Sequence, residues 1–489
     1  MLAPALVWSA IGAFLLFGLV LVWNAARANR GTAADYYLAG SGLGGLVSGL
    51  SYAATTYSAF MLVVLTGLTW QGGIGALGFE LIYFAGLSLL VVFGPRFWLA
   101  GKRWGFISPA EMIGARYGSR AVAAAMAAVS LLFLIPYCTT QMAGIGLLLS
   151  GATGGGISLA AAVVTGAALA LVWTLFAGLR SVAWTDAGQA VVMMVSGLLA
   201  VALVVAALGS PSAMVAALST EDAAWLDVPG PGLWSLGTFL ALSVPWFFFA
   251  ITNPQVSQRL FMLRDLGAMR RMILWVLGVG FVFTLIAVIW GFAARLLAPD
   301  LAVPGEATPA LLASGVLPAW VSVLLILGIL SAAVSTLDSI ALTVGSMVAR
   351  DLLPEGTRDA AQILWGRVVV ILVIAFAAVF ALRGARIVEQ LAALSAAGLA
   401  VTVPPVVGAF FWRCGTAAGA LACLLGGAAL AMFMVMVRGV SVYDPALAFS
   451  VIGASVLLFV VVSLATRPRA TALDFAGELR AELDAHRVW

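Results

Sequence analysis

The chain of 489 residues is 63% hydrophobic and only 9% charged, with a net charge of +4. A soluble surface needs about a quarter of its residues charged, so this composition excludes a soluble protein and indicates an integral membrane protein. The single histidine, His486, and three cysteines that stand in apolar runs exclude histidine-based catalysis, an HExxH zinc site, histidine-ligated haem and a disulfide framework.

Apolar runs of about 20 residues recur along the whole chain, and each is long enough to cross a membrane as a helix. The first run lacks a charged n-region and is longer than the core of a signal peptide, so we interpret it as a helix as well. We therefore predict an all-α polytopic membrane protein with thirteen transmembrane helices, at residues 4–24, 44–68, 76–99, 120–150, 157–178, 182–208, 234–258, 272–294, 317–349, 362–382, 389–412, 417–437 and 446–466.

Arginine and lysine residues divide unequally between the two sides of this arrangement. With the N-terminus outside, twenty of the 24 lie in cytoplasmic loops or the tail, among them Arg259, and the other four are Arg295, Arg383, Arg386 and Arg438. This split follows the positive-inside rule, so the basic balance does not indicate nucleic-acid binding. It predicts a multi-pass protein of the cell membrane with an external N-terminus and a cytoplasmic C-terminus, and it leaves no arginine deep within a span.

Two predicted spans carry interruptions. The span 44–68 contains "GLVSGLSYAATTYSAFML", with small and hydroxyl-bearing residues at its centre, and the span 234–258 contains Pro245 and Asn253-Pro254. A helix can break within a membrane only where protein, water or ligand satisfies its free backbone groups. Because these spans open successive groups of five helices, they predict a transporter of two inverted repeats. The predicted parts are an N-terminal helix and loop (1–42), the first repeat (43–208), an extracellular loop (209–233), the second repeat (234–412), two further helices (413–466) and a tail (467–489).

Polar and aromatic residues inside the predicted spans are candidate functional groups. Glu80 either serves an ion or pairs with another helix, and Gln141 either binds substrate or bridges helices. Asp186 falls in the first turn of its predicted helix, where the helix dipole favours a carboxylate, so structural and functional interpretations are both open. Trp246 and Phe249 belong to an aromatic run after the proline of the seventh span, which either packs against lipid or gates a pocket.

The ninth span contains "ILSAAVSTLDSI", in which Ser331, Ser335 and Asp338 form one stripe of a helix and Thr336 and Ser339 lie beside it. These side chains offer only oxygen ligands, which suit a hard cation. Serine and threonine can also bond to the carbonyl four residues earlier or join neighbouring helices. Because an intramembrane carboxylate indicates function, we predict a cation site here, with Asp338 serving a second ion, a proton or a structural bond.

Five stretches carry a resemblance to a known family: "ADYYLAGSGLGGLVSGLSYAATTYSA", "GFISPAEMIGARYG", "GLRSVAWTDAGQAVVM", "NPQVSQRLFMLRD" and "SAAVSTLDSIALTVGSMVARDL". Together they resemble the sodium/solute symporter family, and the resemblance runs nearly end to end. It implies a LeuT-like fold of two inverted five-helix repeats, with one extra helix before the core and two after it. The second to eleventh predicted spans would be the ten core helices.

The resemblance also implies a sodium site between core helices one and eight. Its ligands would be the backbone carbonyls of Ala54, Tyr57 and Ala332 and the hydroxyls of Ser335 and Thr336. Asp186 falls where family members have an acidic residue linked to sodium passage or to a second ion. Thr56, which is aspartate or asparagine in some members, and Ser58 are expected near the substrate.

We therefore predict a secondary active transporter, not an enzyme, that imports a small organic solute with sodium as the coupling ion. The span containing "LIPYCTTQMAGIG" is more similar to the pantothenate and monocarboxylate branches than to the sugar branch, which favours a small organic anion. A carrier of an amino acid such as proline, a proton-coupled carrier and a membrane sensor of the same fold remain alternatives. The expected partners are the solute and the lipid bilayer, with neither nucleic acid nor an obligate protein partner.

Overall fold

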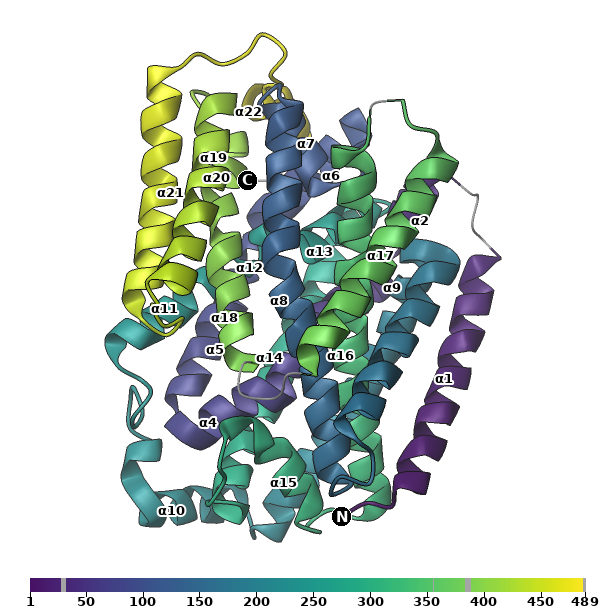
Figure 1. Cartoon of the computed structure of the whole chain (residues 1–489), viewed down its shortest axis with the longest axis vertical. Helices are drawn as coiled ribbons and strands as arrows, with labels where there is room; N and C mark the ends of the chain where they lie inside the picture. The colour runs from purple at the N-terminus through teal and green to yellow at the C-terminus, as the bar shows by residue number, and fades with distance from the viewer. Residues whose placement is uncertain (28–31, 355, 383–387, 487–489) are drawn as a thin grey trace.

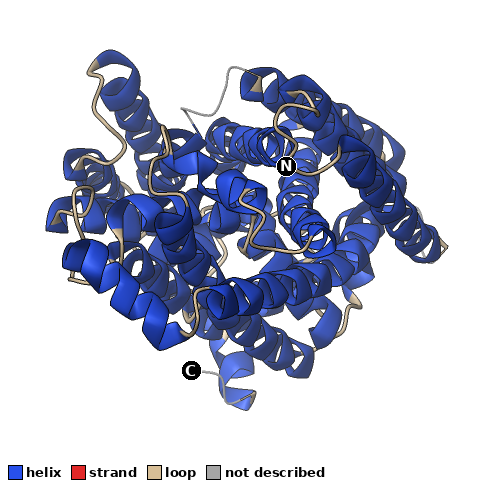
Figure 2. Ribbon diagram, turned by 90° about the horizontal axis from the view of Figure 1, so that it is seen from below, coloured by secondary structure: helices blue, strands red, loops and turns tan. Residues whose placement is uncertain are grey.

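Long apolar helices run side by side along one axis of the molecule (Figure 1). The computed structural model describes residues 1–27, 32–354, 356–382 and 388–486, and within these ranges the only β contact is an isolated bridge between Leu43 and Leu263. An end-on view shows the helices packed around one another (Figure 2). The prediction of an all-α membrane protein is confirmed.

The long helices, with the short elements that continue some of them, are α1 (Pro4–Ala26), α5 (Gly75–Gly86) with α6 (Leu89–Trp104), α8 (Arg120–Ala152), α9 (Leu159–Ala207), α14 (Leu266–Leu297), α16 (Ala319–Met347) with η6 (Val348–Leu352), α17 (Asp359–Ala381), α18 (Val388–Leu399) with α19 (Val403–Phe411), α20 (Ala417–Met432) and α21 (Pro445–Ala465). Short helices outside the spans are α2 (Ala33–Leu38), α7 (Pro109–Arg116), α10 (Pro211–Asp222), α15 (Ala307–Ala313), α22 (Phe475–Glu478) and α23 (Arg480–Ala485).

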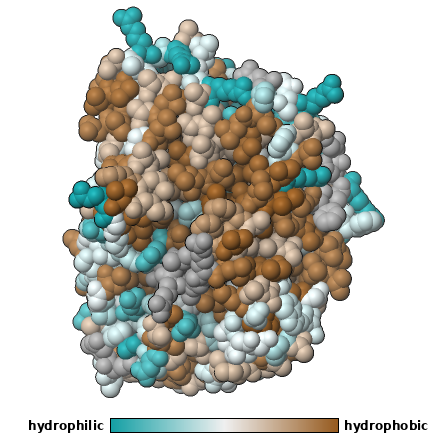
Figure 3. Space-filling view, in the orientation of Figure 1, coloured by the Kyte–Doolittle hydropathy of each residue, from teal (hydrophilic) through white to brown (hydrophobic). Residues whose placement is uncertain are grey.

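Among the described residues, ten helices are long and apolar enough to cross a membrane, or eleven if one bent pair is counted as a span. Two further predicted spans, 157–178 and 234–258, coincide with shorter apolar helices at Leu159–Leu175 and Leu236–Phe247. The predicted number of thirteen is therefore not confirmed. In the space-filling view, apolar residues dominate the middle of the surface and polar residues gather toward both ends (Figure 3).

The second predicted span is broken into α3 (Gly45–Thr56), η2 (Phe60–Leu65) and α4 (Thr66–Gly72). Tyr57 leaves helical geometry, with φ −93° and ψ 76°. The helix axis bends by 44° across this break. The interruption predicted from the small and hydroxyl-bearing residues is thus present, and it falls at the end of the "SYAATTYS" segment.

The seventh predicted span is broken into α11 (Leu236–Phe247), α12 (Phe249–Thr252) and α13 (Pro254–Ser257), and η4 (Gln258–Met262) follows. Pro245 lies inside α11 and does not end it, so the first break comes at Phe248. Asn253 is extended, with φ −92° and ψ 107°, because a residue before proline avoids the helical region. Breaks in these two spans agree with an organisation in two repeats, whose boundaries stay a prediction.

The fifth and sixth predicted spans form one element, α9, in which Gly178 is non-helical with φ 62° and ψ −151°. Glycine tolerates this positive φ, and a Cβ at this position would collide with the backbone of Tyr36. The second half of α9 therefore starts at Gly178, and Asp186 lies about two turns into it. The prediction that Asp186 sits in a first helical turn was wrong, so a helix dipole does not account for this carboxylate.

Helix α16 lies at the centre of the bundle and carries the hydroxyl-rich stretch. Its residues 328–347 are all buried, and it packs against α9, α3, α17 and α8. Because lipid does not reach this helix, its polar groups must bond to protein, water or an ion.

Arg103 and Arg295 come from opposite sides of the predicted arrangement. Arg103 pairs with Glu478 and Glu482 of the tail at 3.0 and 2.9 Å. Arg295 lies at the far end of α14, over two tryptophan rings. Which end faces the cytoplasm stays a prediction, and Arg30, Arg383, Arg386 and Arg487 lie outside the described residues.

Candidate functional site

The end of α3 leaves four backbone carbonyls without a continuing helix, and each of them finds a partner. The Tyr57 N–H donates to the Ala53 carbonyl at 2.8 Å. Hydroxyls of other helices donate to the next three carbonyls: Ser335 to Ala54 at 2.9 Å, Thr336 to Thr55 at 3.2 Å and Tyr83 to Thr56 at 3.1 Å. Side chains of α16 and α5 thus satisfy the break, as a break inside a membrane requires.

Two of these hydroxyls also bond within α16. The Ser335 and Thr336 hydroxyl oxygens also lie 3.1 and 3.0 Å from the Ala332 carbonyl, so each hydroxyl shares its single proton between two acceptors. Five oxygens therefore meet between α3 and α16, namely these two hydroxyls and the carbonyls of Ala54, Thr55 and Ala332. All five are neutral, hard ligands of the kind that coordinate sodium at broken helices in transporters.

The structure brings together four of the five predicted sodium ligands: Ala54, Ala332, Ser335 and Thr336. The Thr55 carbonyl joins them and was not predicted. The ring of Tyr57 packs toward α5 and α14, and no described bond joins its carbonyl to this group. The chemistry of the group suits a sodium ion, since the two hydroxyls can rotate their protons away and direct their lone pairs inward.

Gln141 of α8 and Ser58 accept hydrogen bonds from the free backbone N–H groups on the other side of the break. The Ala59 N–H donates to the Gln141 side-chain oxygen at 3.2 Å, and the Phe60 N–H donates to the Ser58 hydroxyl at 3.1 Å. Gln141 also donates to Ser58 at 3.2 Å, and the Ser58 and Tyr137 hydroxyls lie 3.2 Å apart. These two predicted substrate residues therefore lie together, and both cap free N–H groups at the start of η2.

Trp246 lies in an aromatic cluster beside the same break. Its ring stacks on Phe249 with centroids 5.6 Å apart, and its centroid lies 4.8 Å from that of Phe60 and 5.3 Å from that of Tyr83. Trp246 and Phe249 are only 4% and 2% exposed. Both rings therefore face protein, and the alternative of lipid-facing packing is wrong for them.

A narrow space lies beside these rings, and its lining comes from α8, the broken seventh span and α18. The lining residues are Tyr137, Trp246, Phe249, Asn253, Ala392, Ser395 and Ala396. The space is narrow, because no part of it is large enough for a water molecule.

A buried ion pair lies one helical turn from the five oxygens. Arg259 of η4 donates to Asp186 of α9 at 2.7 Å, and the two side chains are 1% and 0% exposed. Arg259 also donates to the Ser51 and Ser339 hydroxyls at 3.1 and 2.5 Å and to the Gln255 carbonyl at 2.7 Å. Such a pair tolerates burial only when these additional hydrogen bonds are complete.

The expectation that Arg259 lies in a cytoplasmic loop, and that no arginine is deep in the molecule, was wrong. The segment η4 folds against the start of α3, where the Leu43 N–H donates to the Met262 carbonyl at 3.1 Å and the Arg264 N–H donates to Leu43 at 3.1 Å. This pairing directs Arg259 inward. The signal in the sequence was the three polar residues Gln255, Ser257 and Gln258 directly after the Asn253-Pro254 break, all of them buried.

Asp338 lies next to the ion pair and contacts it through Ser339. The Ser339 hydroxyl lies 3.3 Å from its Oδ1 and donates to the Ser335 carbonyl at 2.5 Å. The Oδ2 of Asp338 and the Oδ1 of Asp186 are buried without partners. Two carboxylates thus lie near one guanidinium, and Ser339 connects this group to the helix turn that carries Ser335.

Glu80 of α5 is separate from both groups and is 0% exposed. Thr284 of α14 donates to its Oε1 at 3.4 Å, while its Oε2 is buried without a partner. The hydroxyl of Thr56 is also buried without a partner. Glu80 therefore has no basic partner among the described side chains.

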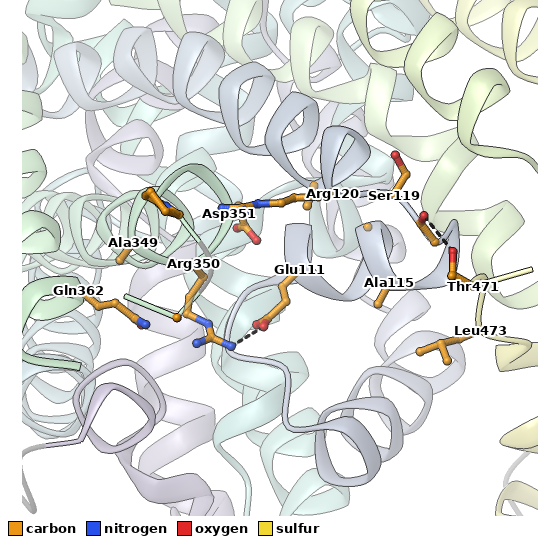
Figure 4. A pocket seen from close by; sticks show the side chains of 15 residues that line it. Glu111, Ala115, Ser119, Arg120, Ala349, Arg350, Asp351, Gln362, Thr471 and Leu473 are labelled. Atoms are coloured by element: carbon orange, nitrogen blue, oxygen red, sulfur yellow. Dashed lines mark hydrogen bonds and ion pairs between the residues drawn. The ribbon is translucent and has the colours of Figure 1, made fainter. Parts of the chain in front are cut away.

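A cavity of about 660 Å³ lies away from these groups, at the end of the molecule that carries the tail (Figure 4). Arg350 and Glu111 point toward each other there and bond at 2.5 Å, and Ser108 donates to Asp351 at 2.6 Å. The tail residue Thr471 forms part of one wall. Because these charged groups bond within the protein, we place the candidate site at the break of α3 instead.

A family model described as "Sodium:solute symporter family" matches residues 36–427 of the chain. The "Uncharacterized symporter YodF" of Bacillus subtilis (strain 168) is 27% identical over 121 residues. This match covers 24% of the chain and 24% of that relative, so it spans about a quarter of the relative's length.

Solved structures share the fold. A Na+-coupled sialic acid symporter, in a substrate-bound outward-open state, has a TM-score of 0.78 at 17% identity and covers 94% of this chain and 98% of its own. Mhp1, a nucleobase-cation-symport-1 family transporter with bromovinylhydantoin bound, has a TM-score of 0.58 at 15% identity, over 90% and 97% of the two chains. MhsT in complex with L-phenylalanine has a TM-score of 0.55 at 15% identity, over 85% and 98%.

Proposed function

The chain belongs to the sodium:solute symporter family, a family of sodium-coupled membrane transporters, and on this premise we propose that it imports a small organic solute with sodium by alternating access. The observation that carries the proposal is the group of five oxygens between α3 and α16. We assign this group as the sodium site, with the carbonyls of Ala54, Thr55 and Ala332 and the hydroxyls of Ser335 and Thr336 as ligands.

Sodium at this position would join the broken end of α3 to the buried helix α16. A ligand shifts a conformational equilibrium only through different affinities for the two states. Because the five oxygens come from two helices, a state in which α3 moves away from α16 would lose part of the ligand set. Sodium binding therefore favours one state, and sodium loss allows α3 to move.

The ion pair of Arg259 and Asp186 lies between the sodium site and the end of the molecule that carries the tail. Ser339 follows Ser335 by one turn in the direction of η6, and Arg259 donates to Ser339 at 2.5 Å. We assign this end as cytoplasmic, with the N-terminus outside, which makes the pair a closure on the cytoplasmic side. An ion released into the cytoplasm would pass Asp186.

We assign the narrow space beside Trp246 and Phe249 as the solute site. The lining has no basic side chain, and the N–H groups of η2 already bond to Gln141 and Ser58. A monocarboxylate or pantothenate-like anion, our first candidate, would then be held by Asn253 and by the nearby sodium ion. An amino acid of the proline type is the second candidate, because its amino group suits the aromatic rings through cation–π contact.

A thermal-shift screen of the purified protein tests this proposal, using carboxylates, amino acids and sugars with sodium or with choline. A transported solute should raise the unfolding temperature more in sodium than in choline. Uptake of that solute into proteoliposomes should then require sodium.

Uptake that continues unchanged when choline replaces sodium at fixed pH would contradict the sodium site and favour proton coupling. Sodium-dependent stabilisation by a solute that is never taken up would favour a membrane sensor instead.

A further inference from the structure

The C-terminal tail lies across one end of the bundle, where α22 and α23 contact α19 and α6 (Figure 1). Before these short helices, the Leu473 N–H donates to the Ala115 carbonyl of α7 at 3.3 Å. The two helices bury three apolar side chains that are spaced four residues apart: Phe475, Leu479 and Leu483. Side chains at this spacing lie on one face of a helix, so the tail presents a single apolar face to the bundle.

Phe475 joins the tail to two helices that belong to different predicted repeats. Its ring stacks on Trp104 of α6, in the first repeat, with centroids 5.0 Å apart. It also stacks on Phe410 of α19, in the second repeat, at 5.4 Å. The Phe475 side chain is buried, so it fills the space between the ends of α6 and α19.

Ion pairs connect the tail to the same two helices. Arg103 of α6 pairs with Glu478 and Glu482, and Arg413, two residues after α19, pairs with Asp474 at 3.2 Å. These side chains are exposed, and exposed ion pairs contribute little individually. The buried ring is therefore the principal link, and the ion pairs add to it.

A row of buried rings leads from Phe475 to the proposed cytoplasmic closure. The centroid of Phe410 lies 5.6 Å from that of Phe97 on α6, and Phe97 stacks on Phe261 of η4 at 5.9 Å. None of the four rings is more than 5% exposed. Phe261 follows Arg259 by two residues, so the row ends in the segment that carries the buried ion pair.

The end of α6 also holds η4 directly. The Trp98 indole N–H donates to the Leu263 carbonyl at 2.8 Å, and a Cβ at Gly101 would lie 2.5 Å from the ring of Phe261. Because α6 and η4 pack this closely, a movement of η4 away from α9 requires a movement of α6.

We propose that the tail is an autoinhibitory strap that slows opening toward the cytoplasm. The docked tail ties α6 to α19 and so holds η4, with Arg259, against Asp186. This inference rests on the proposed transport function, in which Arg259 and Asp186 must separate before sodium and solute leave. The tail shifts the equilibrium between the two states, because its contacts to α6 and α19 are complete only while these helices stay together.

Reaction of a buried cysteine with a maleimide measures this opening without any solute. Ser346 of α16 is buried, and the Gln258 side chain of η4 donates to its hydroxyl at 2.9 Å, so Ser346→Cys becomes accessible when η4 moves. The purified full-length protein would carry Cys138→Ala and Cys414→Ala, and labelling would be followed in choline buffer. Adding Phe475→Ala should raise the labelling rate of Ser346→Cys by roughly tenfold, because a buried aromatic contact no longer favours the docked state.

Two controls separate this effect from a general loosening of the fold. Cys423 of α20 is buried against the Val401 carbonyl, and its labelling rate, measured without Ser346→Cys, should not change in Phe475→Ala. Arg480→Ala, at an exposed tail side chain, should leave the labelling of Ser346→Cys at the rate of the intact tail. An unchanged rate in Phe475→Ala, or an equal rise at Cys423, would refute the strap.

A second variant tests the strap if Phe475→Ala fails to fold. Glu478→Gln/Glu482→Gln removes both ion pairs of Arg103 and keeps the ring, so it should raise the labelling rate of Ser346→Cys about two- to threefold. The increase should shrink in concentrated choline chloride, because salt screens the same pairs in the intact tail. In that case, no increase in the double variant would refute the strap.

Sodium provides a separate test of the proposed function. The five oxygens and the ion pair of Arg259 are formed in the same state, so sodium should slow the labelling of Ser346→Cys in the intact protein. Labelling that is insensitive to sodium but faster in Phe475→Ala would contradict the sodium site and leave the strap intact. Labelling that sodium slows and Phe475→Ala leaves unchanged would refute the strap alone.

Discussion

Arg259 and Asp186 form a buried ion pair with 2.7 Å between nitrogen and oxygen, although 73 residues separate them along the chain. The two residues come from the two predicted repeats. Their contact fixes η4 against α9 and orients the serines of α3 and α16 around the guanidinium. The pair thus connects η4, α9, α3 and α16 next to the proposed sodium site.

Breaking this pair should destabilise the protein strongly. Asp186→Asn leaves a buried guanidinium without its counter-charge, a change that costs about 3–5 kcal/mol in other proteins. We expect a clear fall in the unfolding temperature of the purified protein, and the same from Arg259→Gln. The double variant Asp186→Asn/Arg259→Gln should recover much of the loss, because neither side then carries an unpaired charge.

The exposed pair of Arg264 and Asp265, at 2.9 Å, supplies the control. Arg264→Gln should change the unfolding temperature little, since exposed ion pairs contribute about 0–1 kcal/mol. Losses that simply add in the double variant would show that Asp186 and Arg259 do not act as a pair.

The hydroxyls of Ser335 and Thr336 should set the affinity for sodium. Ser335→Ala and Thr336→Ala should each raise the sodium concentration for half-maximal thermal stabilisation about tenfold, because each removes one ligand from the cation. Ser339→Ala should instead lower the unfolding temperature with little change in sodium affinity, since its hydroxyl bonds to Arg259. Equal shifts in affinity from all three variants would mean that the site lies on another face of α16.

Gln141 should stabilise the break of α3 even when no solute is bound. Gln141→Leu leaves the Ala59 N–H without a partner, which costs about 1–3 kcal/mol for a buried group, and removes one of the hydrogen bonds of the Ser58 hydroxyl. We expect a lower unfolding temperature without any solute present. The matched control is Gln189→Leu, because both polar atoms of Gln189 are buried and unpaired, so this change should be neutral or stabilising. An unfolding temperature lower in Gln189→Leu than in Gln141→Leu would contradict this role of Gln141.

Phe475 should anchor the tail to the end of the bundle. Its side chain is 1% exposed and stacks on Trp104 and Phe410 with centroids 5.0 and 5.4 Å apart. Phe475→Ala removes a buried ring, a change that typically costs about 3–5 kcal/mol, so limited proteolysis should cut the tail much faster. Arg480→Ala, at a tail side chain that is 81% exposed, should leave the cleavage rate near that of wild type. Equal rates for both variants would show that the tail is held elsewhere.

The local pattern of apolar and polar residues was sufficient to predict the membrane class and the two interrupted spans. Helix-length apolar runs and the scarcity of charge require an all-helical membrane protein, because lipid offers no hydrogen bonds to a backbone. The small and hydroxyl-bearing residues of α3 and the Asn253-Pro254 pair of the seventh span marked the breaks for the same reason. Helical periodicity singled out the oxygen-rich stretch around Ser335, and the assignment of Ser335 and Thr336 as sodium ligands came from the family resemblance.

Long-range contacts decided the rest of the candidate site. Asp186 was placed in a first helical turn because the non-helical Gly178 was not visible as the start of that half-helix. Arg259 was placed in a loop because its burial depends on η4 folding against the start of α3. The role of Gln141 was left open between a substrate contact and a bridge between helices, because its bond to the Ala59 N–H joins positions 82 residues apart.

The sequence by itself therefore determined the all-helical membrane class, where two of the predicted spans break and which helix offers oxygen ligands. These features follow from hydrophobicity, backbone hydrogen bonding and helical periodicity, which act between near neighbours. Only the tertiary structure decided which of the buried carboxylates bonds to an arginine and which does not. Electrostatic compensation depends on distances of a few ångströms between groups that the chain itself holds far apart.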